Sequence, residues 1–69
     1  MSVAAYDLLE GAITRGTRLA FRRRGSEYVV SPERLRLLDG REQVLARHPS
    51  TGHRLELWVD ELDSVEAVR

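Results

Sequence analysis

The chain has 69 residues, with 11 basic and 11 acidic side chains and a formal net charge of zero. This length predicts one small domain, and the zero total predicts no strong nonspecific attraction to nucleic acid. Cysteine is absent, which excludes disulfides and thiolate metal sites and is typical of a reducing compartment such as the cytoplasm. No segment has the pattern of a membrane span or a signal peptide, so we expect a soluble cytoplasmic protein without a membrane partner.

Residues 3–15 are predicted to form an amphipathic helix. Their apolar side chains recur at the spacing of one helix face, at Ala5, Leu8, Leu9, Ala12 and Ile13. Ser2 is a candidate N-cap, and Gly16 is a natural stop because glycine adopts the left-handed conformation that ends many helices. Gly11 lies inside this helix, at a cost of about 1 kcal/mol relative to alanine.

Beyond the helix, short segments alternate between apolar and polar side chains, which is the period of strands with one buried face. The expected strands lie at about residues 17–24, 27–31, 34–38, 42–48 and 54–59, with a short last strand at 64–68. Gly25-Ser26 and Asp39-Gly40 are predicted to be turns, and Asp-Gly is typical of a hairpin turn whose two central residues need positive φ angles. Pro32 indicates an edge, a bulge or a strand end, because it has no N–H to donate. Residues 60–62 are expected to form a single tight turn.

These elements predict a mostly β, α+β fold in a single domain, residues 1–69. We expect an N-terminal helix followed by a five-stranded antiparallel SH3-like or Sm-like small barrel. A barrel removes the edges that a flat sheet would expose, and the helix stripe is expected to cover its open end.

The charges are segregated along the chain, with −2 in residues 1–10, +6 in residues 11–54 and −4 in residues 55–69. This pattern predicts an exterior on which bases and acids occupy separate regions and steer partners. All eleven bases are arginine, which suits bidentate contacts with phosphate or carboxylate groups. The alternative is a codon bias of a GC-rich genome, which produces the same composition without a functional reason.

Short motifs follow one another over residues 8–66 in the order of the predicted elements. They are Leu8–Ile13, Gly16, Leu19–Phe21, Val30–Pro32, Leu35, Asp39–Arg41, Val44–Ala46, Gly52, Val59-Asp60 and Ser64–Glu66. Together they resemble the WYL domain, an Sm-like barrel of bacterial transcription regulators that sense nucleotide-type or nucleic-acid ligands. The resemblance implies a noncatalytic regulatory module in bacterial transcription that binds an anionic ligand or nucleic acid.

The chain departs from that family at the positions that bind its ligands. The motif after which the family is named would fall at residues 43–45, where only Leu45 matches. The family's ligand-binding arginines would fall near Tyr28, Trp58 and Glu61. The resemblance therefore implies that the usual anion site has been lost or rebuilt in this chain.

The helix carries a second resemblance. Tyr6-Asp7, Leu9-Glu10 and Ala12 resemble the tyrosine-aspartate and leucine-glutamate segment of the Rho-binding antiterminators, the Rof family. Those small proteins bind the termination factor Rho and block its RNA site. As an alternative function, this resemblance implies Rho as a protein partner that contacts Tyr6, Asp7 and Glu10.

A row of outward arginines is the candidate site for an anionic ligand or nucleic acid. It consists of Arg18, Arg22 and Arg24 on one strand, with Arg34 and Arg36 two elements further on. Several guanidinium groups on one sheet supply both the charge and the fork geometry that phosphates need. The alternative is a solvated strand face whose arginine stems cover apolar surface. Tyr28 and Trp58 are the aromatic side chains expected to be free to stack on bases.

Trp58 also supports a third functional hypothesis. Its strand face is opposite to that of Leu55, Leu57 and Val59, so that it either anchors an interface or packs under the helix or the last strand. An interface through Trp58, or through an open strand edge, would make the chain a self-assembling structural subunit and predicts a homo-oligomer.

The sequence contains no nucleophile elbow and no glycine-rich phosphate loop, so an enzyme is not expected. His48 and His53 flank a turn, but two histidines without a third ligand make a poor zinc site. Asp60, Glu61 and Asp63 lack the spacing of a calcium loop. We therefore expect neither a metal nor a cofactor.

Overall fold

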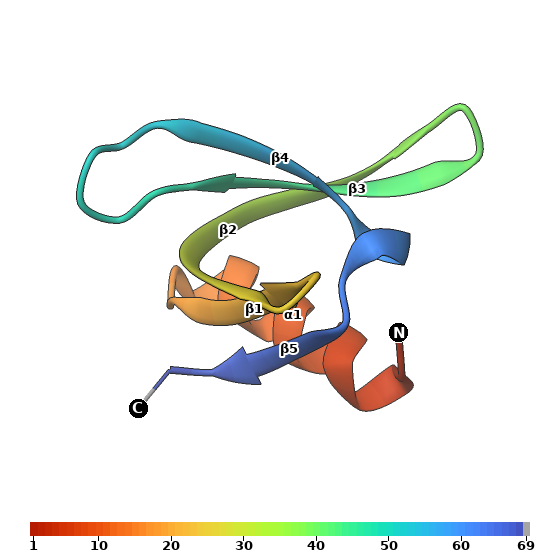
Figure 1. Cartoon of the computed structure of the whole chain (residues 1–69), viewed down its shortest axis with the longest axis horizontal. Helices are drawn as coiled ribbons and strands as arrows, with labels where there is room; N and C mark the ends of the chain where they lie inside the picture. Colours follow the sequence, from red (N-terminus) through yellow and green to blue (C-terminus); the bar gives the residue numbers. More distant parts are fainter. Residues whose placement is uncertain (69) are drawn as a thin grey trace.

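The computed structural model describes residues 1–68 as one helix followed by a bent antiparallel sheet (Figure 1). The elements are α1 (Val3–Arg15), β1 (Leu19–Arg23), β2 (Ser26–Leu38), β3 (Arg41–Arg47), β4 (Arg54–Trp58), the 3₁₀ helix η1 (Val59–Glu61) and β5 (Ser64–Ala67). The five strands lie in the order β4-β3-β2-β1-β5. This arrangement confirms the predicted fold class, a helix with a small five-stranded antiparallel barrel-like sheet.

The structure corrects the prediction of separate strands at residues 27–31 and 34–38, because both belong to β2. The first half of β2 pairs with β1 and the second half with β3. The register shifts between Pro32 and Arg34, which marks a bulge. A bulge bends its strand, and it tolerates a proline because the ladder is interrupted there. At this bulge β2 passes from one half of the sheet to the other. Figure 1 shows the bend of β2.

The two hairpin turns next to β2 have the backbone that type I′ turns require. Asp39 and Gly40 have φ angles of 51° and 78°, as the Asp-Gly pair predicts. Arg24 and Gly25 have φ angles of 51° and 79°, so the first turn lies one residue before the predicted Gly25-Ser26. Thus Ser26 already belongs to β2.

Both predicted helix ends are confirmed. The Ser2 hydroxyl oxygen accepts a hydrogen bond from the backbone N–H of Ala5 at 3.1 Å. Gly16 ends α1 in the left-handed conformation, with φ 69°. Leu9 and Ala12 are the buried residues of α1, and they belong to the predicted apolar stripe.

The core combines the helix with both halves of the sheet. Its buried apolar members are Leu9, Ala12, Leu19, Phe21, Val30, Val44, Ala46, Leu57, Val59 and Val65. The helix packs against β2 and β5, and the Tyr6 hydroxyl donates a hydrogen bond to the Glu42 carboxylate of β3. These contacts hold α1 over the inside of the curved sheet, so its outer face remains available to solvent.

The edge strands β4 and β5 lie at opposite ends of the strand order and are connected through η1. Among residues 1–68 no backbone ladder joins β4 to β5, so the sheet curls without closing through hydrogen bonds. The predicted turn at residues 60–62 is η1, in which the N–H of Leu62 bonds to the carbonyl of Val59 at 3.1 Å. Within the described part of the chain, no helix is long and apolar enough to cross a membrane.

Candidate functional site

The outer face of β2, β3 and β4 carries a group of polar side chains that could hold a ligand. Cross-strand register places them in three successive rows: Ser31, Arg47 and Arg54; Arg34, Leu45 and Glu56; Arg36, Gln43 and Trp58. Successive rows lie two residues apart along β3 and β4, or about 7 Å. On β2 the bulge adds one residue between the first two rows. The opposite face of the same strands carries Val44 and Leu57, which are buried in the core.

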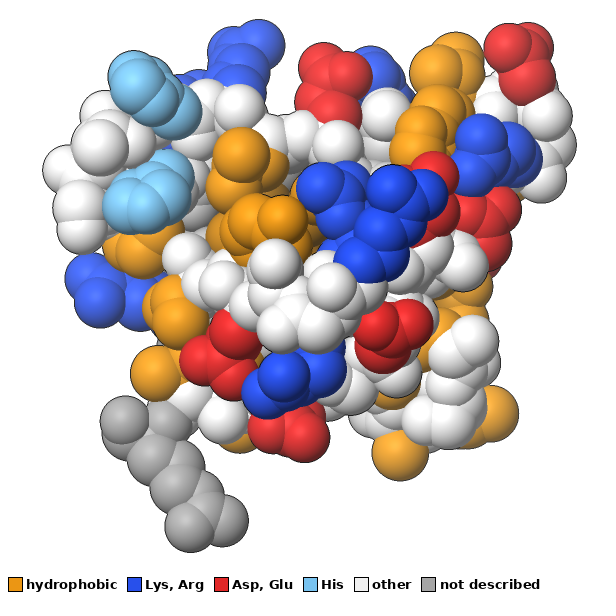
Figure 2. All heavy atoms as spheres, viewed as in Figure 1, with side chains coloured by type: hydrophobic (Ala, Val, Ile, Leu, Met, Phe, Trp, Pro, Cys, Tyr) orange, Lys and Arg blue, Asp and Glu red, His pale blue; other side chains and the backbone are white. Residues whose placement is uncertain are grey.

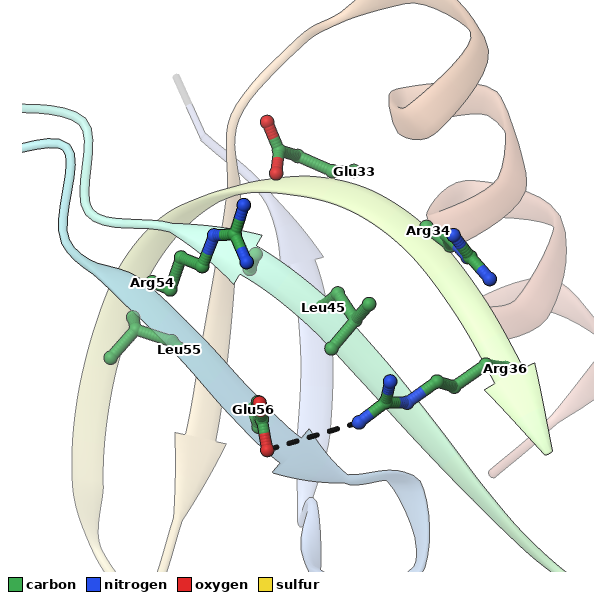
Figure 3. A pocket seen from close by; sticks show the side chains of 8 residues that line it. Glu33, Arg34, Arg36, Leu45, Arg54, Leu55 and Glu56 are labelled. Carbon is green, nitrogen blue, oxygen red and sulfur yellow. Dashed lines mark ion pairs between the residues drawn. The ribbon is translucent and has the colours of Figure 1, made fainter. Parts of the chain in front are cut away.

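A hollow of about 280 Å³ opens on this outer face. Its lining consists of Glu33, Arg34, Arg36, Leu45, Ala46, Arg54, Leu55 and Glu56. Figure 3 shows Leu45 on β3 between the side chains of β2 and β4, with Arg34, Arg36 and Arg54 around it. We call this feature the Leu45 hollow. Its floor is apolar, and its rim carries three arginines beside Glu33 and Glu56, which leaves a net positive charge. This lining suits a ligand that has both an anionic and an apolar part.

The arginines of the face differ in whether an acid balances them. Arg36 Nη2 lies 3.9 Å from Glu56 Oε2, and Arg47 Nε lies 3.0 Å from Glu33 Oε2. Arg34 and Arg54 form no ion pair and no side-chain hydrogen bond with any residue from 1 to 68. The uncompensated positive charge of the Leu45 hollow therefore comes from Arg34 and Arg54.

Beside the Leu45 hollow, on the same outer face, Arg41 stacks on Trp58. The guanidinium carbon of Arg41 lies 4.0 Å from the centre of the Trp58 ring. Asp60 accepts two hydrogen bonds from Arg41, from Nε at 3.0 Å and from Nη2 at 2.8 Å. The hydrogen bond with Arg41 lowers the pKa of the Asp60 carboxyl, and the same bond raises the pKa of Arg41. Trp58 is half-buried beneath the guanidinium rather than free.

The predicted arginine row is divided between two parts of the sheet. Arg34 and Arg36 line the Leu45 hollow, whereas Arg18, Arg22 and Arg24 do not. Arg22 lies on β1, 3.4 Å from Glu27, and the Arg24 backbone N–H bonds to the Asp63 carboxylate at 3.0 Å.

Tyr28 also lies away from the hollow. It lies on the first half of β2, where it pairs with the buried Phe21 of β1. The Arg23 guanidinium lies 5.4 Å from the centre of the Tyr28 ring. Of the two aromatic side chains predicted to stack on bases, only Trp58 shares a face with the hollow.

Sequence reasoning missed Arg54 and Arg41. The alternation of Arg54, Glu56 and Trp58 already placed Arg54 on the outer face of its strand. Its position opposite Arg47, beside the hollow, depends on the register between β3 and β4. No local signal in the sequence brings Arg41 to Trp58, because these residues come from different strands.

The expectation of separate basic and acidic regions is wrong. Figure 2 shows basic and acidic side chains next to one another on the face it presents. Arginines of the central segment pair with acids of the last segment, as in Arg23–Glu61 at 3.8 Å and Arg41–Asp60 at 2.8 Å. Both acids lie in η1, which brings the acidic last segment of the chain against arginines of β1 and β3.

The residues of the alternative protein site differ in exposure. Asp7 and Glu10 are exposed on α1, and within the described residues neither forms an ion pair. Tyr6 is half-buried and its hydroxyl bonds to Glu42. A partner at this helix would meet the two acids but not a free tyrosine hydroxyl.

The histidine pair has a role in the turn between β3 and β4. His48 Nδ1 accepts hydrogen bonds from the backbone N–H groups of Ser50 and Thr51, at 3.3 and 3.4 Å. In the part of the chain that the structure describes, no three His, Cys, Asp or Glu side chains are grouped so that they could hold a metal ion.

Comparison with known proteins yields no family model, no curated protein and no solved structure that matches this chain.

Proposed function

We propose that this chain is a non-enzymatic binding module that holds a phosphate-bearing ligand, a nucleic acid or a nucleotide, in the Leu45 hollow. The proposal depends on one observation: Arg34 and Arg54 border this hollow without an acidic partner among residues 1–68. Guanidinium forks bind phosphate oxygens in pairs, and an unpaired guanidinium can do so without breaking an existing ion pair. Arg36 supplies a third cation at the rim, although it lies 3.9 Å from Glu56.

The exposure of the site sets the strength and the salt dependence of this binding. The hollow is open to water, so each phosphate contact is screened by salt. Two phosphates neutralised on a single strand correspond to a slope of about −1.4 in a plot of log K against log salt concentration. We therefore expect binding that weakens clearly, but not steeply, as salt is added.

The resemblance to the WYL domain supports a nucleotide-type ligand and a regulatory role in bacterial transcription, in the cytoplasm. The family's naming motif would fall at Gln43–Leu45, where only Leu45 matches, and Leu45 is the apolar floor of the hollow. Arg34 and Arg54 would replace the arginines that the family places elsewhere. This favours an anion site that has been rebuilt rather than lost.

The test compares two double substitutions that change the charge equally. Arg34→Glu with Arg54→Glu alters the hollow, whereas Arg15→Glu with Arg18→Glu alters exposed arginines of α1 and its C-terminal connection. Binding of a labelled single-stranded oligonucleotide is followed by fluorescence anisotropy, with nucleotides as competitors. We expect at least a tenfold loss of affinity for the first pair and a small loss for the second. Equal losses for both pairs would mean that binding is a nonspecific effect of net charge.

A second candidate is an inhibitor of the Rof type that binds Rho through α1. Asp7 and Glu10 support it, because both are exposed and neither forms an ion pair within residues 1–68. Asp7→Lys with Glu10→Lys should abolish capture of purified Rho, whereas the Arg34 and Arg54 substitutions should leave it unchanged. If the native chain captures no Rho, this candidate is excluded.

A further inference from the structure

Arg41 presents a flat guanidinium whose orientation is fixed from two sides. The Trp58 ring supports one face at 4.0 Å, and the Asp60 carboxylate holds one edge through hydrogen bonds of 3.0 and 2.8 Å. A guanidinium group that is held by two hydrogen bonds and by stacking has little freedom to rotate. The plane of the Arg41 guanidinium is therefore fixed before a ligand binds. The side chain of Arg41 is nevertheless 44% exposed.

The charge of Arg41 is balanced, whereas Arg34 and Arg54 have no ion pair within the described residues 1–68. Asp60 lies 2.8 Å and Glu61 3.6 Å from the Arg41 guanidinium. A phosphate at this position would meet two carboxylates, so the site disfavours an anion. A weakly hydrated planar surface remains, and bases of single-stranded nucleic acids stack on guanidinium planes and aromatic rings.

The stack lies next to the Leu45 hollow on the same outer face. Trp58 pairs with Gln43, which is two residues from Leu45 along β3, or about 7 Å. Arg36 connects the two features, since it lines the hollow and its Nε donates a hydrogen bond to Gln43 Oε1 at 2.8 Å. This spacing allows one ligand to place a phosphate in the hollow and a neighbouring base on the stack.

We propose that Arg41, supported by Trp58 and Asp60, is a base-stacking platform, and that the ligand in the hollow is therefore a short single-stranded oligonucleotide. This inference rests on the proposed function, because the hollow supplies the phosphate contacts. Stacking on the platform adds a separate contribution to the binding affinity, which depends on the presence of a base rather than on the phosphate charge.

The single tryptophan of the chain makes this contribution measurable, since Trp58 lies directly under the Arg41 guanidinium. The native chain is titrated with a short oligothymidylate and with an abasic oligomer of the same length. Stacking of one base is expected to increase affinity about tenfold and to quench Trp58 fluorescence. The abasic oligomer should bind through the phosphates alone, with little quenching.

Arg41→Lys removes the planar guanidinium but keeps the positive charge, so it tests the planar surface alone. In this variant the two oligomers should bind with equal affinity, close to that of the native chain for the abasic oligomer. Arg15→Lys is the matched control on the exposed side of α1 and should keep the full difference. Thermal unfolding of each variant verifies that it is folded.

The outcomes distinguish this inference from the proposed function. If the native chain binds both oligomers equally and Arg34→Glu with Arg54→Glu weakens both, the platform is wrong and the phosphate site stands. If Arg41→Lys retains the tenfold preference for oligothymidylate, the platform is also wrong. If the native chain binds neither oligomer, the platform is wrong. If it also binds no free nucleotide, the proposed function fails with it.

Discussion

The hydroxyl of Tyr6 donates a hydrogen bond to the carboxylate of Glu42, which joins helix α1 to the start of β3. The two residues are 36 positions apart in the chain, so this bond holds the helix against the sheet. The bond to Glu42 raises the pKa of the Tyr6 phenol, and partial burial and the negative charge of Glu42 raise it further.

Removing this hydroxyl is expected to weaken the attachment of the helix. Tyr6→Phe should lower the free energy of unfolding by about 1–2 kcal/mol, because a hydrogen bond to a charged group is lost. Urea unfolding followed by far-ultraviolet circular dichroism measures the change. Tyr28→Phe is the matched control, since no described residue forms a hydrogen bond with the Tyr28 hydroxyl. Equal losses in the two variants would contradict this account.

The same bond predicts a dependence on alkaline pH. The folded chain holds the Tyr6 proton more tightly than the unfolded chain, whose phenol has the ordinary pKa of 10.0. The stabilisation is therefore complete below about pH 10 and is lost as the pH rises through the higher folded pKa. The difference in unfolding free energy between the native chain and Tyr6→Phe should stay constant up to about pH 9 and shrink above pH 10. A difference that grows in alkali would exclude the bond.

Leu9 is the helix residue on which the core depends most. It is fully buried, at 0% exposure, and belongs to the cluster that joins α1 to both halves of the sheet. Leu9→Ala should cost about 3 kcal/mol, which is a large part of the stability of so small a domain. Leu37→Ala serves as the control, because Leu37 is 70% exposed near the tip of the β2–β3 hairpin. Thermal unfolding should show a much lower melting temperature for Leu9→Ala only.

Two glycines should respond oppositely to alanine. Gly40 has a φ angle of 78° in the hairpin turn, so Gly40→Ala should destabilise the chain by about 1–2 kcal/mol. Gly11 lies within α1, where the three heavy atoms nearest to an added methyl group all belong to the Arg15 guanidinium, the closest at 2.8 Å. This flexible side chain can move away, so Gly11→Ala should stabilise the helix by about 0.5–1 kcal/mol. Chemical unfolding of both variants tests the two signs, and a loss of stability for Gly11→Ala would mean that Arg15 is held in place.

The elements that the sequence predicted well are those with strong local signals. Ser2 and Gly16 indicated the helix ends correctly, because a cap acts on backbone groups within a few residues. Pro32 indicated an irregularity but not its result, since the same residue fits a strand end and a bulge equally well. The structure resolves this choice in favour of one long bent strand, in which Val30 and Leu35 belong to opposite halves of the sheet.

The candidate site was predicted only in part. Alternation identified Arg34 and Arg36 as outward residues, and both line the Leu45 hollow. It also grouped them with Arg18, Arg22 and Arg24, because alternation shows which face of a strand a residue occupies but not where that strand lies. Arg54 joined the site through the pairing of β4 with β3, which depends on a contact between separate strands.

The sequence by itself determined the helix, the alternating strands and their turns, because short-range spacing and backbone preferences specify these elements. Only the tertiary structure decided that Arg34 and Arg54 would have no acidic partner among residues 1–68, while Arg41 would be balanced by Asp60 and stacked on Trp58. Whether two charges neutralise each other depends on a distance of a few ångströms, and that distance is set by strand register and by the bend at Pro32 rather than by position along the chain.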